Sequence, residues 1–307
     1  MKRAKVLKLP PVMTEAESDK MVGEYLTADA VKVLVTQDCD VYDKVTGRCL
    51  AKYRKNIIPG NVQLDAYNSL IHAAKLTDSN RGTAGGKKEG KAMRYRVLKD
   101  GTRSNTLITD KTEMGIVGYF DRSIRFPNCR LTSFTKHEFE KFRKAYPIIK
   151  FVDNKYAELM PKEYKSQRTM CDKTSQDFVI RNTAFTTVTV NKNWQTAIHK
   201  DKGDYKDGFG NLVALRKGKF VGGYLVLVRW GVGFDLQNGD LLLMDVHQWH
   251  ANTPITYDNK DVVRLSLVMY YRERMIECGS KEQELQRAKN RRKGDPVFKD
   301  APKPKKK

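Results

Sequence analysis

The chain has 307 residues, a net charge of +22 and a sequence pI near 9.7. The sequence lacks the run of about 18 apolar residues that a membrane span needs, and its basic N-terminus lacks the apolar segment of a secretory signal. A positive field of this size attracts polyanions, because binding to phosphates releases condensed counterions. We therefore expect a nucleic-acid partner, no membrane, and no obligate protein partner.

The five cysteines are odd in number, scattered along the chain and without a CxxC motif. This pattern argues against a disulfide framework and against a zinc ribbon. It favours a reducing, intracellular setting, which would be the host cytoplasm for a phage-encoded protein or the nucleus for a eukaryotic one.

Residues 1–20 are predicted to form a flexible basic arm, because Pro10 and Pro11 interrupt regular structure. Residues 21–177 are predicted to form a mixed, largely helical region that buttresses the core and contributes to DNA binding. The β-branched segment 31–37 is predicted to be a strand. Apolar residues near a helical period predict helices over 61–76, 135–146 and 150–167, the last interrupted or ended near Pro161.

The segment 79–105 is rich in glycine and in basic residues. It is interpreted either as a mobile loop that follows a phosphate backbone or as a solvated linker.

From residue 178 to residue 275, short β-rich runs alternate with Gly, Asp and Asn turns, which is typical of a sandwich or barrel. Residues 276–307 are predicted to form a helix and a basic tail. Ser280 and Gln283 have the spacing of a capping box at the start of that helix. The tail adds either non-specific DNA affinity or only solubility.

A histidine and a carboxylate stand two residues apart at His199 and Asp201, and His247 and His250 follow about fifty residues later. Two histidines and one carboxylate form the facial triad of non-haem Fe(II) oxygenases, which leaves positions open for a 2-oxo acid and dioxygen. Arg264 lies within an apolar strand and matches the far carboxylate of a 2-oxo acid with two parallel hydrogen bonds. An anionic ligand would explain a charge at such a position.

The order of these motifs resembles the 2-oxoglutarate and Fe(II) dioxygenases, and most closely their TET and base-J-binding (JBP) branch, which oxidises 5-methylpyrimidines in nucleic acid. The resemblance covers residues 178–275 and rests on the stretches NTAFTT, HKDKGD, GGYLVL, NGDLLLMD, HANTPI and VVRLSLVMYY. It implies an α+β fold with a double-stranded β-helix (jelly-roll, cupin-like) core and flanking helices.

The resemblance also implies roles for individual residues. His199, Asp201 and His250 would bind Fe(II), with His250 preferred to His247 because it directly precedes the ANTP turn. Arg264 would bind 2-oxoglutarate. Asp204 matches a family position near the substrate base, and the GYFD stretch with Asp121, followed by Arg122, would also contact the substrate. Some family members carry an arginine shortly before the H-x-D motif, where this chain has residues 193–195, Asn-Trp-Gln.

The expected activity is therefore hydroxylation of 5-methylcytosine in double-stranded DNA, with Fe(II), 2-oxoglutarate and ascorbate as reductant. Because the target methyl group is shielded within a duplex, the base must be flipped out. The alternatives are hydroxylation of thymine to 5-hydroxymethyluracil, an RNA or protein-bound substrate, and a jelly-roll protein that binds DNA without catalysis.

Overall fold

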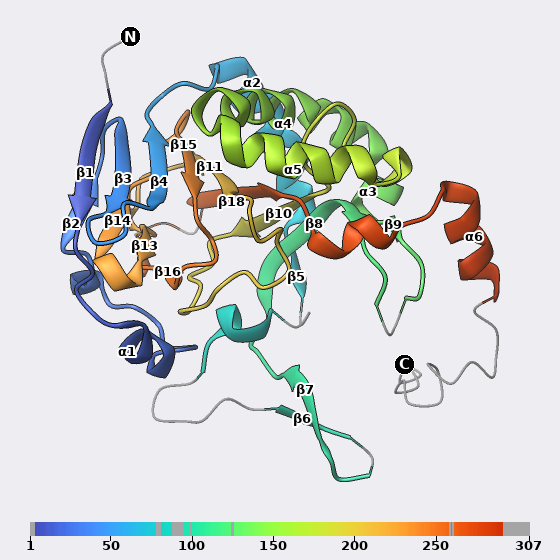
Figure 1. Ribbon diagram of the computed structural model, residues 1–307, viewed down its shortest axis with the longest axis horizontal. Helices are drawn as coiled ribbons and strands as arrows, with labels where there is room; N and C mark the ends of the chain where they lie inside the picture. The colour runs from blue at the N-terminus through green and yellow to red at the C-terminus, as the bar shows by residue number, and fades with distance from the viewer. Residues whose placement is uncertain are drawn as a thin grey trace.

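The protein is described by a computed structural model over residues 4–77, 81–87, 95–98, 100–123, 126–257, 259 and 261–290 (Figure 1). No helix in these ranges has the length and apolar content needed to cross a membrane. The C-terminal tail and much of the glycine-rich segment 79–105 lie outside the described residues.

The largest sheet has ten strands in the order β1–β3–β4–β15–β11–β18–β10–β8–β5, with β9 paired to β8. β18 (Val263–Tyr270) is central, and both β10 (Thr187–Lys192) and β11 (Gly210–Lys217) pair with it antiparallel. The other strands are β1 (Lys5–Leu9), β3 (Cys39–Asp43), β4 (Cys49–Arg54), β5 (Lys75–Thr77), β8 (Thr112–Phe120), β9 (Arg130–Leu131) and β15 (Leu241–Met244).

A smaller sheet has the order β16–β13–β14–β2 and contains β16 (His250–Asn252), β13 (Leu225–Leu227), β14 (Val232–Phe234) and β2 (Val33–Val35). It packs against one face of the large sheet through a buried apolar cluster that includes Leu212 of β11 and Phe234 of β14. Two facing sheets of short strands are the predicted jelly-roll core. Two separate pairs are β12 (Val221–Gly222) with β17 (Ile255–Thr256), and β6 (Tyr95–Val97) with β7 (Arg103–Leu107).

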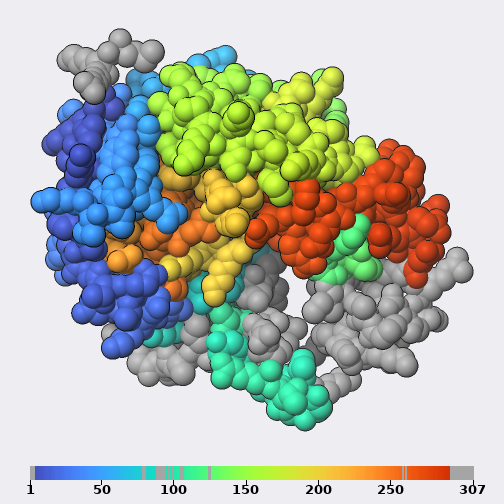
Figure 2. All heavy atoms as spheres, viewed as in Figure 1, coloured from blue at the N-terminus to red at the C-terminus, as the bar shows by residue number. Residues whose placement is uncertain are grey.

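Helices cover the other face of the large sheet (Figure 1). The long helix α4 buries Phe142, Ile149 and Tyr156, spaced at three to four residues or multiples of this, against sheet residues such as Val188 and Leu267. The helices are α1 (Glu15–Lys20), α2 (Gly60–Leu70), α3 (Ser133–His137), α4 (Phe139–Leu159), α5 (Pro161–Lys173) and α6 (Lys281–Asn290). Figure 2 shows the β6–β7 hairpin projecting away from this helical layer.

Helix boundaries differ from the predicted ones in two places. The first helix ends at Leu70, and residues 75–77 form strand β5 instead of a last helical turn. The segment 135–146 breaks at Glu138, and α4 then continues through Pro147 to Leu159 because its buried apolar face runs on without interruption. The break at Pro161, the strand within 31–37 and the Ser280–Gln283 capping box are confirmed.

The prediction of a flexible arm over residues 1–20 is wrong for its described part. β1 pairs in parallel with β3 over five residues, and α1 begins with a capping box formed by Thr14 and Glu17. The two prolines only separate these elements, since β1 is an edge strand and needs no further backbone donor there.

The cysteine pattern argued against a disulfide framework, but Cys129 and Cys278 form a single disulfide across 149 residues of sequence. An odd count permits one pair, and Cys39, Cys49 and Cys171 remain free.

Residue 178 is not a boundary within the large sheet, since β3, β4 and β8 precede it and pair with later strands or with one another.

Candidate active site

Alternate residues of β18 face a single cavity. Successive side chains of a strand point to opposite faces, so Leu265, Leu267 and Met269 pack beneath the helices. The other set lines a cavity of about 500 Å³, a volume typical of small-molecule sites. This set consists of Arg264, Ser266, Val268, Tyr270 and, just beyond the strand, Arg272.

Two histidines and one carboxylate meet on the wall of this cavity, which we call the triad cavity. His199 and His250 form an antiparallel bridge in which each backbone N–H donates to the other's carbonyl oxygen at 3.0 Å. The carboxylate oxygens of Asp201 lie 3.5 Å from Nε2 of His199 and 3.7 Å from Nε2 of His250. The ligand atoms of all three residues lie within 4.8 Å of one another, which suits a single metal ion.

Backbone carbonyls orient both imidazole rings. Nδ1 of His199 lies 2.7 Å from the carbonyl oxygen of Ala197, and Nδ1 of His250 lies 2.9 Å from that of Gln248. Since a carbonyl only accepts, Nδ1 of each neutral ring carries the proton and Nε2 keeps its lone pair for a metal. His247 is excluded from this group, because its Nε2 lies 3.4 Å from the carbonyl oxygen of Asp204 instead.

Electrostatics also favour the metal-binding forms. Burial raises the pKa of Asp201, but the hydrogen bond and charge of His199, with the charges of His250 and Arg81, outweigh burial and hold that pKa well below its usual range. Burial and the neighbouring His199 lower the pKa of His250 to about 4. At neutral pH the site therefore offers a carboxylate and a neutral imidazole, the states that bind metal. The donor set fits the predicted Fe(II) triad.

Arg264 lies in the same cavity with 6% of its surface exposed. Its backbone N–H donates to Oδ1 of Asn193 at 2.6 Å, whereas its guanidinium group makes no hydrogen bond or ion pair to any described residue. Burial, followed by the charge of Arg216, lowers its pKa to about 10, so it remains cationic at neutral pH. An unpaired buried charge is costly, and a carboxylate ligand would relieve this cost with two hydrogen bonds.

Arg81 is a residue of the site that the sequence did not predict. It precedes the short helix η3 (Gly82–Gly85), lines the triad cavity and stands with its guanidinium carbon 5.4 Å from the centre of the Trp194 ring. Its Nε is buried without a hydrogen-bond partner among the described residues. Trp194 lies where some family members carry an arginine, so Arg81 brings a guanidinium to that place from a distant part of the chain.

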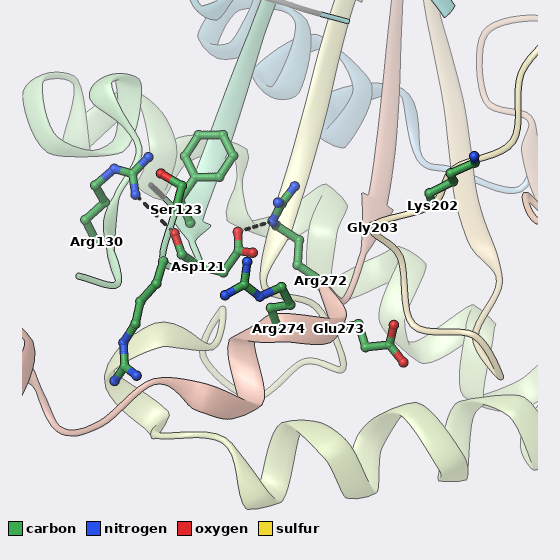
Figure 3. A pocket seen from close by; sticks show the side chains of 10 residues that line it. Asp121, Ser123, Arg130, Lys202, Gly203, Arg272, Glu273 and Arg274 are labelled. Atoms are coloured by element: carbon green, nitrogen blue, oxygen red, sulfur yellow. Dashed lines mark hydrogen bonds and ion pairs between the residues drawn. The ribbon is translucent and has the colours of Figure 1, made fainter. Parts of the chain in front are cut away.

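Asp204 and Arg272 stand opposite each other in an antiparallel bridge, and both line the triad cavity. Nε of Arg272 donates to Oδ1 of Asp121 at 2.7 Å (Figure 3). Burial and the nearby Asp201 raise the pKa of Asp204 well above its usual range, and the charges of Arg272 and Arg81 oppose this only in part. Asp121 and Arg122 do not line the triad cavity; they line an adjacent one. Arg272 was not predicted, although the period-two pattern that begins at Arg264 points to it.

Comparisons with known proteins agree with this geometry. The profile of the family Tet_JBP, described as the oxygenase domain of the 2OGFeDO superfamily, matches residues 115–273. The thymine dioxygenase JBP1 of Trypanosoma brucei brucei is 37% identical over 180 residues, which are 57% of this chain and 21% of that protein. The bifunctional helicase and thymine dioxygenase JBP2 of Leishmania major is 31% identical over 253 residues, which are 81% of this chain and 21% of that protein.

The chain thus spans about a fifth of the length of these curated relatives. Among solved structures, NgTET1 in complex with 5mC DNA superposes with a TM-score of 0.58 at 13% identity, covering 91% of this chain and all of that one. At this identity the likeness concerns the fold alone, and it confirms the predicted double-stranded β-helix.

Proposed function

Because the chain belongs to the TET/JBP family of 2-oxoglutarate- and Fe(II)-dependent oxygenases, we propose that it hydroxylates the 5-methyl group of thymine in DNA. Membership confirms the predicted family, the enzyme class, and Fe(II) and 2-oxoglutarate as cofactor and cosubstrate. The preference for 5-methylcytosine expected from the sequence gives way to its alternative, because the relatives are named thymine dioxygenases.

When bound, iron and 2-oxoglutarate would activate dioxygen, which would oxidise a methyl C–H bond to a hydroxymethyl group while 2-oxoglutarate is oxidatively decarboxylated. We assign His199, Asp201 and His250 to the iron and Arg264 to the far carboxylate of 2-oxoglutarate. Arg81 is assigned to the carboxylate nearer the metal, since it lines the triad cavity together with the three metal-ligand residues and its Nε has no hydrogen-bond partner among the described residues. The lining of the cavity also includes apolar side chains such as Leu212, Leu225 and Val246, which would exclude water from the reacting groups.

The pair Asp204 and Arg272 is the observation that carries the choice of thymine. A flipped base is recognised along its Watson–Crick edge. Thymine offers the O4 acceptor where cytosine offers the N4 amino donor, and a guanidinium group only donates. Arg272 would thus donate to O4 of thymine, while the carbonyl oxygen of the Asp204 carboxyl, which can accept even when the group is protonated, would accept from N3–H. The amino group of 5-methylcytosine would face Arg272 donor to donor.

DNA is proposed as the polymer because the net charge of +22 suits a phosphate backbone and because a base must leave the stack to reach a buried metal site. An intracellular site of action accords with such a substrate. Residues 21–177, in this proposal, contribute to the DNA surface through the segment that carries Arg81.

Nucleoside mass spectrometry tests the proposal. The protein is loaded anaerobically with Fe(II), then given 2-oxoglutarate, ascorbate and air with duplexes that differ only in a thymine or a 5-methylcytosine at one target position. We expect 5-hydroxymethyluracil from the first duplex, and none from an Asp201→Ala variant. Preferential oxidation of 5-methylcytosine would overturn the choice of base. Oxidation of matched RNA alone would overturn the choice of polymer, and DNA binding without any product would indicate a non-catalytic protein.

A further inference from the structure

A second cavity, of about 400 Å³, adjoins the triad cavity. Lys202, Gly203 and Arg272 line both cavities, so this group of residues forms a shared wall. Figure 3 shows Asp121 between Arg130 and Arg272, while Lys202 and Gly203 come from the loop on the other side of Arg272. We call this second space the arginine cavity.

Cations dominate the lining of the arginine cavity. Asp121 is already engaged by Arg272, and Lys202 makes no hydrogen bond or ion pair within the described ranges. Among the residues that the structure describes, Arg274 pairs only with the exposed Glu277, at 3.1 Å, and a surface pair of this kind contributes little to stability. The cations of the lining are Arg122, Arg130, Lys202, Arg272 and Arg274, and its two carboxylates are Asp121 and Glu273.

The two chain segments that carry these arginines are tied together. The Cys129–Cys278 disulfide joins the segment that follows β8 to the segment that follows β18. The buried carboxylate of Glu284 accepts hydrogen bonds from the backbone N–H of Cys129 at 2.7 Å and of Gly279 at 2.9 Å, and it also pairs with Arg122. The cavity is therefore held in shape before any ligand binds, which lowers the entropic cost of binding.

We propose that the arginine cavity binds the phosphodiester group next to the target nucleotide while the base of that nucleotide occupies the triad cavity. The inference rests on the proposed function and assigns the place of the DNA backbone in it. Base and phosphate of one nucleotide are separated by a single sugar, which matches two cavities that share one wall. Lys202, and Arg274 on leaving its exposed partner Glu277, are the cations that we assign to the phosphate, since Arg122 and Arg272 are held by the buried Glu284 and Asp121.

Gly203 supports this path for the strand. A Cβ atom at Gly203 would meet no atom of the described residues within 4 Å, so none of their contacts requires a glycine at this point. A side chain there would project into the open shared wall, where the sugar would pass. Close approach of a ligand backbone is one of the reasons for glycine at such a position.

The experiment neutralises the phosphate and the protein cations in turn. Duplexes carry a methylphosphonate, which lacks the charge, at the phosphate 5′ or 3′ of the target thymine. They are given to the wild type, to Lys202→Gln, to Arg274→Gln and to the double variant. The matched control is Arg143→Gln on α4, an exposed arginine that also pairs with a carboxylate three residues away.

For the wild type, neutralising one of the two phosphates should lower kcat/KM about tenfold, the effect of one charge-assisted contact. The double variant should lose activity on the natural duplex and should no longer respond to the neutral phosphate, whereas Arg143→Gln should respond like the wild type. Gly203→Val should keep the unfolding temperature of the wild type and lose DNA turnover. The proposal would be overturned if the methylphosphonate lowered kcat/KM equally in the double variant and in the wild type. It would also be overturned if neutralising either phosphate left kcat/KM of the wild type unchanged.

Failure of the proposed function gives a different result. If the wild type oxidises neither base, the same duplexes and variants are compared by fluorescence anisotropy at equilibrium. In this assay, the methylphosphonate should weaken DNA binding by the wild type and should leave Kd of the double variant unchanged. The slope of log Kd against log salt should fall by about one for each contact removed. If the double variant keeps the salt slope of the wild type and its response to the methylphosphonate, the phosphate site is rejected, whether or not the protein is catalytic.

Discussion

Replacing Arg272 should change which base the enzyme prefers. If its guanidinium donates to O4 of thymine, a glutamine at this position could instead accept from the N4 amino group of 5-methylcytosine. The contact between a side chain and the correct base is worth about 1–3 kcal/mol of discrimination. The ratio of kcat/KM for thymine to kcat/KM for 5-methylcytosine should therefore fall roughly 5- to 150-fold.

The single substitution Arg272→Gln would change the stability of the protein as well as its recognition of the base. Asp121 is 7% exposed and accepts from Nε of Arg272, and removing one partner of a buried ion pair costs about 3–5 kcal/mol because the other charge is left unpaired. The informative variant is therefore Asp121→Asn with Arg272→Gln, in which two amides can hydrogen-bond to each other. The single variant Asp121→Asn is the control, because it changes the partner of Arg272 and keeps Arg272 itself.

The assay uses a duplex of G·C pairs with a single T·A pair, and a second duplex with a single 5-methylcytosine at the same place. Products are quantified as hydroxymethyl nucleosides at substrate concentrations below KM. A double variant that remains active with the wild-type base preference would refute the reasoning, since Arg272 then does not face the base. A preference that changes equally in Asp121→Asn alone would refute it as well.

Other substitutions test the remaining charges of the site and its support. Arg264→Met should raise the unfolding free energy of the ligand-free protein by about 1–4 kcal/mol, because it replaces a buried unpaired charge with an apolar side chain. We expect 2-oxoglutarate with Mn(II) to raise the unfolding temperature of the wild type but not that of this variant. Arg81→Gln should weaken 2-oxoglutarate binding at least tenfold in an anaerobic titration, while Kd for DNA stays unchanged. Burial raises the pKa of Glu284, but hydrogen bonds from Arg122 and from backbone N–H groups outweigh it and lower that pKa. Glu284 thus stabilises the fold at neutral pH and loses this effect as the pH falls through its folded pKa, below about 4.5. Urea unfolding of Glu284→Gln should show lower stability at pH 7 and a flatter acid dependence between about pH 5 and 3.

The sequence predicted the triad because its signals are local. His199 and Asp201 share one loop, and His250 begins a short strand whose pairing with that loop is fixed by the jelly-roll order. Arg264 was predicted because a charge in an apolar strand needs a ligand or a partner. The same strand alternation, continued to its end, would have predicted Arg272.

Other features depend on contacts that no local pattern encodes. Arg81 reaches the cavity from a loop that precedes His199 by a long stretch of chain. Its segment was interpreted either as a mobile loop along a phosphate backbone or as a solvated linker. The Cys129–Cys278 pair joins segments 149 residues apart, so composition and spacing gave no indication of it. The prolines at positions 10 and 11 were interpreted as disrupting structure, although they only separate strand β1 from helix α1.

The arginines of this region fall into two groups with different consequences. Arg122 and Arg272 are paired with the buried carboxylates Glu284 and Asp121, so their positions are fixed whether or not a ligand is present. Arg264 is buried in the triad cavity and Arg81 is partly buried there, and neither guanidinium forms an ion pair within the described part of the chain. Burial without a counter-charge destabilises the ligand-free protein, and that cost is recovered only when an anion binds. A dicarboxylate that engages both guanidinium groups would satisfy both charges at once. The paired arginines, in contrast, can recognise a neutral base edge or support a phosphate site without such a cost.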